Sequence, residues 1–188
     1  MNFYMDIEQC LKVLKEGGTI LYPTDTIWGI GCDATNSLAA EKIIALKQRP
    51  SEKSFVVLVA SERDVLQYVA APDLAVFDYL KKAERPTTVI YEHALGLADN
   101  VIAEDGSVAI RICRDEFCKY LIKRLRKPIV STSANLSGEP SPVSFREINE
   151  LIIRDVDYVV QYRQKNVLKA VPSSIIKWIN GRVEVLRS

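Results

Sequence analysis

The sequence predicts one α/β domain in which helices flank a mixed, twisted open sheet. Strand-like apolar runs alternate with helical patterns early in the chain, as they do in α/β sheets. Near the end, Asn180-Gly181 lies between two strand-like runs and predicts an antiparallel hairpin, which makes the sheet mixed. A chain of 188 residues fits one core, and no low-complexity tract or compositional shift marks a linker, so we expect residues 1–188 to form a single domain.

The first half of the chain alternates predicted helices and strands. Gly17-Gly18 ends the first helix and Pro23 ends the first strand, so residues 24–26 follow the carboxyl end of a strand, where α/β sheets bind ligands. Apolar periodicity and capping signals predict a helix over residues 6–16, a strand over 19–22, a helix from Asn36 or Ser37 to about Gln48, a strand over 55–60, and helices over 61–69 and 72–83.

The second half carries the remaining strands of the predicted sheet. The same signals predict strands over residues 87–91 and 107–113, a helix over 115–126, a strand over 128–130, a short strand over 158–161, and hairpin strands over 174–178 and 183–186. Ser144 and Glu147 form a capping-box pattern, which predicts the start of a further helix.

Residues 29–34, Gly-Ile-Gly-Cys-Asp-Ala, imitate the glycine fingerprint of a dinucleotide site. That fingerprint requires its first glycine directly between a strand and a helix. Here the strand ends at Pro23 and the next helix begins only after Asn36, so we expect Gly29 and Gly31 to serve a turn and close backbone packing.

The composition excludes several classes of protein. Hydrophobic residues make up 48% and charged residues 26% of the chain, which is typical of a soluble globular protein. No apolar run approaches the roughly 18 residues of a membrane span, and the amino terminus lacks a signal-peptide layout, so we expect a cytoplasmic protein without membrane contact. The net charge of +1 lacks the broad positive field of a dedicated nucleic-acid binder.

The cysteines and the single histidine do not form a predicted metal site. Four cysteines without a C-x-x-C pair and one histidine, His93, lack the usual spacings of zinc ligands. We therefore expect reduced thiols, and we favour a loop position for His93 over a catalytic one, because no nucleophile pattern lies near it.

Two polar clusters carry the functional signal. Lys47, Arg49 and Lys53 are spaced to converge on one anion, and a polyphosphate is the ligand that this spacing favours. A solvated basic helix end gives the same pattern. In residues 131–138, STSANLSG, the polar side chains of Ser131, Ser133 and Asn135 alternate after an apolar strand and can project to one side; the other interpretation is a Ser/Asn-rich turn.

The motifs PTDT, LKQRPSEKS and STSANLSG, in this order and with ERPTTVI, SVAIRI and VEVLRS between and after them, resemble the YrdC/TsaC-like threonylcarbamoyl-AMP synthase family. The resemblance spans Gly17 to Arg187. Within the family, the chain is similar to the short, single-domain branch. It implies a YrdC-like open sheet with a large basic concave cavity. It also implies synthesis of threonylcarbamoyl-AMP and pyrophosphate from L-threonine, bicarbonate and ATP, for the t6A modification of tRNA.

The resemblance also implies roles for individual residues. Lys47, Arg49 and Lys53 would stabilise the phosphates during catalysis, and Mg²⁺ would be held mainly by phosphate oxygens and water, with Asp25 as an outer-shell candidate and no protein metal ligand. ATP would contact Lys47, Arg49, Lys53, Ser107, Ser133, Asn135, Ser141 and Arg187. Threonine would contact Thr26, Arg111, Ser131 and Ser173.

One departure and one rival interpretation accompany the resemblance. Leu58 stands where longer members of the family carry a histidine, which bears on threonine selectivity. The rival is a non-catalytic module for double-stranded RNA or tRNA, or a ribosome assembly factor. The basic stretch over residues 119–127 would contribute to it, although we favour a solvated helix end for that stretch. As a synthase, the protein would pass its product to t6A-transfer proteins.

Overall fold

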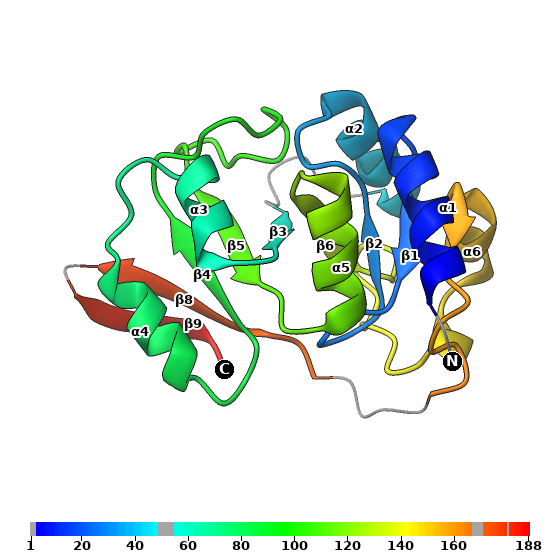
Figure 1. The fold of residues 1–188 in the computed structure, drawn as a ribbon. Coiled ribbons are helices and arrows are strands. Elements are labelled where there is room, and N and C mark those ends of the chain that lie inside the picture. Colours follow the sequence, from blue (N-terminus) through cyan, green and yellow to red (C-terminus); the bar gives the residue numbers. More distant parts are fainter. Residues whose placement is uncertain (1–2, 49–54, 167–170, 180) are drawn as a thin grey trace.

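A mixed β-sheet forms the centre of the molecule (Figure 1). The computed structural model describes residues 3–48, 55–166, 171–179 and 181–188, and these contain a nine-stranded sheet in the order β7-β1-β2-β6-β3-β5-β4-β8-β9. The strands are β1 (Ile20–Tyr22), β2 (Gly29–Gly31), β3 (Val56–Val59), β4 (Thr87–Tyr91), β5 (Val108–Ile112), β6 (Ile129–Ser133), β7 (Tyr158–Val159), β8 (Ser174–Ile179) and β9 (Arg182–Arg187).

Parallel and antiparallel pairs share this sheet, as the sequence predicts. Strands β3 and β5, β4 and β8, and β1 and β7 pair in parallel. The other neighbouring strands pair antiparallel, including the predicted carboxyl-terminal hairpin of β8 and β9. The predicted mixed α/β class is therefore confirmed.

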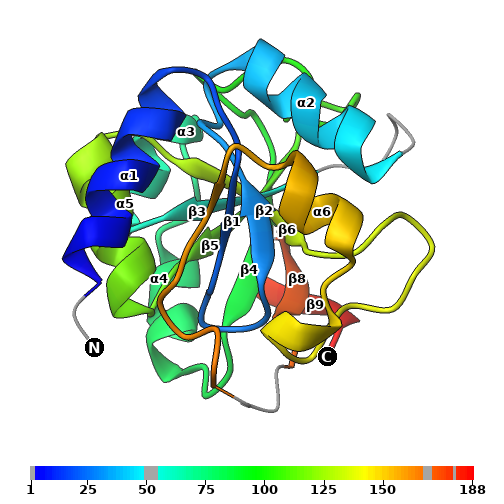
Figure 2. The ribbon, with the colours of Figure 1, turned by 90° about the vertical axis from the view of Figure 1, so that its right-hand side faces the viewer.

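Helices cover both faces of the half of the sheet that contains β1 and β2. Figure 2 shows α1 and α5 side by side on one face and α2 and α6 on the other. The α-helices are α1 (Tyr4–Lys15), α2 (Ser37–Lys47), α3 (Glu62–Tyr68), α4 (Ala75–Lys82), α5 (Glu116–Leu125) and α6 (Glu150–Asp155). None of the helices in the described parts of the chain is long and apolar enough to cross a membrane.

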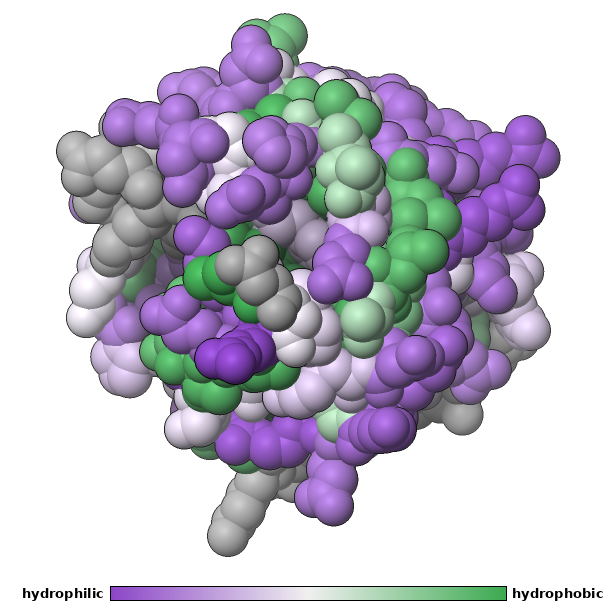
Figure 3. All heavy atoms as spheres, turned by 90° about the vertical axis from the view of Figure 1, so that its left-hand side faces the viewer, coloured by the Kyte–Doolittle hydropathy of each residue, from purple (hydrophilic) through white to green (hydrophobic). Residues whose placement is uncertain are grey.

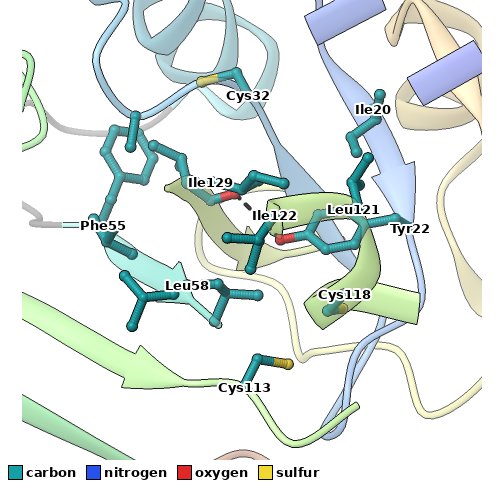
Figure 4. Close-up of a cluster of buried hydrophobic side chains, with 14 of the residues drawn as sticks. Ile20, Tyr22, Cys32, Phe55, Leu58, Cys113, Cys118, Leu121, Ile122 and Ile129 are labelled. Atoms are coloured by element: carbon teal, nitrogen blue, oxygen red, sulfur yellow. Dashed lines mark hydrogen bonds between the residues drawn. The ribbon is translucent and has the colours of Figure 1, made fainter. Parts of the chain in front are cut away.

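Buried apolar side chains form one cluster between the sheet and these helices. Figure 4 shows Ile122 of α5 beside Leu58 of β3 and Ile129 of β6. These three side chains are at most 4% exposed, and burial of each large aliphatic side chain contributes about 1.5–3 kcal/mol. The core thus fixes α5 against the central strands.

The helix starts follow local capping signals that were visible in the sequence. The Asn36 side chain accepts a hydrogen bond from Ala39 N at 3.1 Å, and Ser61 accepts one from Asp64 N at 3.3 Å. The expectation that Ser144 and Glu147 start a helix is wrong. Ser144 precedes only a 3-10 turn, Phe145–Glu147, and α6 begins three residues after that turn with Asn149 as its cap.

The glycine pair at residues 29 and 31 lies in a strand that the sequence analysis did not predict. Strand β2 is only three residues long, and two of these residues are glycines, which are more common in turns than in strands. A Cβ atom on Gly31 would lie 2.4 Å from the Val130 carbonyl oxygen and 2.7 Å from the Tyr22 ring. Close backbone packing, one of the two expected roles, therefore explains Gly31, and no turn does.

The other end of the sheet carries α4 and the β8–β9 hairpin. The rings of Tyr79 in α4 and Trp178 in β8 lie 6.0 Å apart between centroids, and the Trp178 indole donates a 2.7 Å hydrogen bond to Asp73. Figure 3 faces this end of the molecule and shows a mostly hydrophilic surface with apolar patches between polar residues.

Candidate functional site

A cavity of about 230 Å³ lies at the point where several strand ends meet. Its wall comes from the segment between β1 and β2, from β6, from the end of β5, and from the start of β8 and the end of β9. The lining residues include Thr26, Gly29, Val56, Arg111, Ser131, Ser133, Ser173 and Arg187. Hydroxyl groups and arginines, which come from segments far apart in the sequence, thus share one cavity.

The strand register explains why these side chains meet. Val56 of β3 pairs with Ala109 on one side and with Ser131 on the other, so the three side chains share a face of the sheet. Side chains two residues apart on a strand point the same way, which adds Arg111 and Ser133 to that face. At Gly29, which pairs with Ser133, a Cβ atom would lie 3.1 Å from Ser131 Oγ; the missing side chain leaves room beside the hydroxyl.

Arg111 is a buried cation with unused hydrogen-bonding capacity. Its side chain is 5% exposed, and Nη2 lies 3.1 Å from Oδ1 of Asp25, an ion pair without hydrogen-bond alignment. Nε and Nη2 donate to no acceptor among the described residues. Asp25 Oδ2 accepts a hydrogen bond from the Arg114 backbone N–H, which fixes the carboxylate. Since buried donors are normally satisfied, the guanidinium is suited to an anionic ligand.

Arg187 brings a second guanidinium to the cavity and links the end of β9 to Ser173, which precedes β8. Nε and Nη2 of Arg187 donate to the Ser173 carbonyl oxygen at 3.2 and 2.9 Å. The Ser173 hydroxyl in turn lies 2.9 Å from the Thr88 hydroxyl. Burial, and then the charge of Arg111, lower the pKa of Arg187 from its ordinary value. Two cations of like charge thus face one small volume, which favours an anion between them.

Lys47 lies beside the cavity and contacts the loop after β6. Its side chain is buried, and Nζ donates to the carbonyl oxygens of Ser133 and Asn135. The Asn135 amide donates to Leu136 O and Glu139 O at 2.9 and 2.7 Å. The two motifs that the sequence analysis singled out, the end of α2 and STSANLSG, are therefore bonded to each other.

The structure brings together part of the predicted set of site residues. Thr26, Arg111, Ser131, Ser133, Ser173 and Arg187 all line the cavity, whereas Lys47 and Asn135 lie beside it as described above. Arg49 and Lys53 lie outside the described residues. The roles of all these residues in binding stay predictions.

Three further residues of the prediction do not line the cavity. Ser107 precedes β5 and its N–H donates to Asp105 Oδ1, and Ser141 is half-buried in the segment after β6. Leu58 pairs with Arg111 and lies on the same face of the sheet, but its side chain is fully buried in the core and does not line the cavity.

Sequence reasoning missed the role of Asp25 and the contacts of Lys47. Asp25 was a candidate for an outer-shell magnesium contact, but its carboxylate pairs with Arg111. Within the described residues no group of three or more His, Cys, Asp or Glu side chains is placed to hold a metal ion. The PTDT motif indicated a functional role for Asp25. No sequence pattern could predict that its partner is Arg111, which lies 86 positions later in the chain.

Known proteins share the sequence pattern over almost the whole chain. The Sua5/YciO/YrdC family model, which is described as "Telomere recombination", matches residues 12–188. The chain belongs to the Sua5/YciO/YrdC family. A protein of Idiomarina loihiensis named threonylcarbamoyl-AMP synthase is 31% identical over 169 residues, which cover 88% of this chain and 90% of that relative. A protein of the same name from Pseudoalteromonas translucida is 29% identical over 97% of this chain and 98% of its own length.

Solved structures share the fold of this Sua5/YciO/YrdC member. P. abyssi Sua5 superposes with a TM-score of 0.88 at 23% identity; the match covers 100% of this chain and 57% of Sua5. Another structure of that protein, solved with L-threonine, gives 0.85 at 22% identity and covers 97% of this chain and 54% of Sua5. E. coli YciO gives 0.83 at 21% identity, over 98% and 89% of the two chains. The YrdC-like architecture expected from the sequence is confirmed.

Proposed function

We propose that the protein is a threonylcarbamoyl-AMP synthase, which joins L-threonine, bicarbonate and ATP and releases pyrophosphate. The observation that carries the proposal is the buried Arg111 guanidinium, whose Nε lacks an acceptor among the described residues and which shares its cavity with hydroxyl side chains. An amino acid ligand needs a cation for its carboxylate and polar partners for its other groups. The curated relatives that carry this enzyme name, at 31% and 29% identity, support the same activity.

Arg111 is the proposed partner of the threonine carboxylate. The planar guanidinium fits a carboxylate with two parallel hydrogen bonds, and Asp25 holds it from one side. The hydroxyls of Thr26, Ser131 and Ser173 line the same cavity and supply polar contacts for the amine and side-chain hydroxyl. The P. abyssi Sua5 structure with L-threonine, whose fold this chain shares, supports threonine as the ligand.

ATP is the proposed second substrate at the Arg187 side of the cavity. Arg187 and Ser133 line the cavity, and Lys47 donates to the carbonyl oxygens of Ser133 and of Asn135 in the loop that follows it. Arg49 and Lys53, which lie outside the described residues, follow the last residue of α2 by two and six positions in the sequence and are our proposed phosphate ligands. Ser107, Asn135 and Ser141 complete the proposed nucleotide contacts.

The proposed chemistry requires no protein nucleophile. The threonine amine attacks the carbon of carbon dioxide derived from bicarbonate and loses a proton, which gives a carbamate. A carbamate oxygen then attacks the α-phosphorus of ATP, and the bond from that phosphorus to the bridging oxygen breaks as pyrophosphate leaves. The protein contributes orientation of both substrates and charge stabilisation by its cations.

Magnesium would reach this site with ATP rather than through protein ligands. The described residues hold no cluster of metal-binding side chains, and the nearby carboxylate of Asp25 is committed to Arg111 and Arg114. The side chains in the described part of the chain thus do not fit a resident metal ion. A cytoplasmic location and transfer of the product to tRNA through t6A-transfer proteins complete the proposal.

Variants at the two cavity arginines test this assignment of substrates. Arg111→Lys keeps the charge beside Asp25 but loses the planar fork, so we expect the KM for threonine to rise at least tenfold with the KM for ATP nearly unchanged. Arg187→Lys should instead raise the KM for ATP. Steady-state pyrophosphate release measures both constants. Equal effects of each variant on both substrates would contradict the assignment.

A further inference from the structure

A second cavity, of about 250 Å³, lies away from the proposed active site. It is a groove between α3 and the carboxyl end of α5, and its lining includes Pro128, which precedes the first residue of β6. The first cavity contains Ser133, the last residue of the same strand. The two cavities therefore occupy opposite ends of β6, and the proposed synthase reaction gives no role to the second.

Three cations line this groove and leave it with an excess of positive charge. Lys127 Nζ pairs with Asp33 Oδ2 at 2.5 Å. Lys123 and Arg126 make no ion pair or side-chain hydrogen bond within the described residues. The one acidic residue of the lining, Asp64, has an oxygen occupied by the Ala60 N–H at 2.9 Å. Lys123 and Arg126 are thus unpaired among the described residues and available to an anionic ligand, against the single negative charge of Asp64 on the groove wall.

Arg126 has a strained backbone conformation. It follows the last residue of α5 with φ of +59°, in the left-handed region that helix ends usually fill with glycine or asparagine. A side chain in that region costs about 1–2 kcal/mol, and such residues gather at functional sites. A glycine there would relieve the strain but would remove a cation from the groove.

The rest of the lining suits a flat, partly apolar group. Val59 and Ile122 give aliphatic surface, and the half-buried Tyr68 at the end of α3 offers an aromatic ring. Tyrosine rings stack on nucleobases with any base sequence, at about 1–3 kcal/mol per base. The volume is just below the range of about 300–1,000 Å³ for drug-sized ligands, which suits a ligand of mononucleotide size.

We propose that this groove binds a nucleoside monophosphate, with the phosphate between Lys123 and Arg126 and the base against Tyr68. A phosphate monoester carries about 1.5–2 negative charges at neutral pH, which matches the two available cations. Lys123 and Arg126, two cations of the basic stretch over residues 119–127 that the synthase reaction leaves unexplained, receive a function in this way. The site does not depend on the activity proposed for the first cavity.

A titration with AMP, followed by nuclear magnetic resonance of the ¹⁵N-labelled full chain, tests the proposal by position. We expect saturable shifts of the backbone amides of Gln67, Tyr68 and residues 123–127. Adenosine and inorganic phosphate, each tested alone, should bind this groove at least tenfold more weakly than AMP. The proposal would be overturned if the shifts were confined to residues of the first cavity. It would also be overturned if adenosine or inorganic phosphate bound the groove with the same affinity as AMP.

Variants of the groove residues test the site through two quantities, the affinity for AMP and the Tm, which should change in opposite directions in Arg126→Gly. Arg126→Gly should weaken AMP binding at least tenfold and raise the Tm, because glycine accepts the left-handed conformation without strain. Lys123→Gln should weaken binding without the gain in Tm. Lys119→Gln, on the same helix but outside the lining, is the matched control and should bind AMP as the wild type does. Unchanged AMP affinity in both groove variants would refute the site.

Discussion

The buried pair of Asp25 and Arg111 makes Asp25→Asn an informative perturbation. Both side chains are less than a tenth exposed, and 3.1 Å separates Oδ1 of Asp25 from Nη2 of Arg111. At an effective dielectric constant of about 20, two unit charges at this distance attract each other by about 5 kcal/mol. Asparagine keeps the shape and the acceptor for the Arg114 N–H, so the substitution removes chiefly the charge.

We expect Asp25→Asn to lower the free energy of unfolding by about 3 kcal/mol, because it leaves the Arg111 charge buried without its partner. For a chain of this length the loss corresponds to a fall in Tm of about 6–12 °C. Urea and thermal unfolding followed by circular dichroism measure both quantities. The threonine KM should rise as well, because Asp25 orients the guanidinium.

The control for this variant is Asp78→Asn, an exposed carboxylate on α4 that pairs with Lys81 at 3.5 Å. Its Tm should stay within about 2 °C of the wild type. The double variant Asp25→Asn/Arg111→Gln should lose at least about 1 kcal/mol less than the sum of the single variants, because the two charges depend on each other. If Asp25→Asn were as stable as the control, the ion pair would not hold Arg111.

Gly31→Ala should destabilise the fold by about 1–3 kcal/mol in urea unfolding, since its Cβ would lie 2.4 Å from a backbone oxygen; wild-type stability would contradict the packing of β2. Asn36→Ala should cost about 1 kcal/mol through loss of the α2 cap, and an unchanged unfolding midpoint would argue against that cap. Burial raises the pKa of the Cys32 thiol from 9.0 to about 12, so only the unfolded chain loses this proton above pH 9.0. Stability should therefore fall between these pH values, and less steeply in Cys32→Ala.

Local signals made most of the fold predictable from the sequence. Asn36, Ser61 and Asp115 cap helices at the positions that their side chains indicate, because a cap depends on residues only three positions away. Asn180-Gly181 predicts the hairpin in the same local way. Strand β2 escaped prediction because its glycines have low strand propensity and its position depends on tight contact with β6.

The candidate site was predictable as a set of residues but not as a geometry. Family resemblance and hydroxyl-rich motifs pointed to Thr26, Ser131 and Arg111, which do share a cavity. No local pattern connects Asp25 with Arg111, or Lys47 with the carbonyl oxygens at and just after the end of β6, because these contacts arise from strand order and long-range packing. Lys47 looked like a free cation, whereas its ammonium group is buried against a loop.

The most direct test of the proposed function is pyrophosphate release by the purified protein with ATP, magnesium and bicarbonate, in the presence of L-threonine, of L-serine, or of no amino acid. The account predicts release that depends on L-threonine, is lower with L-serine, and is accompanied by an adenylate with the mass of threonylcarbamoyl-AMP. A protein that binds ATP but releases no more pyrophosphate with threonine than without it would contradict the account.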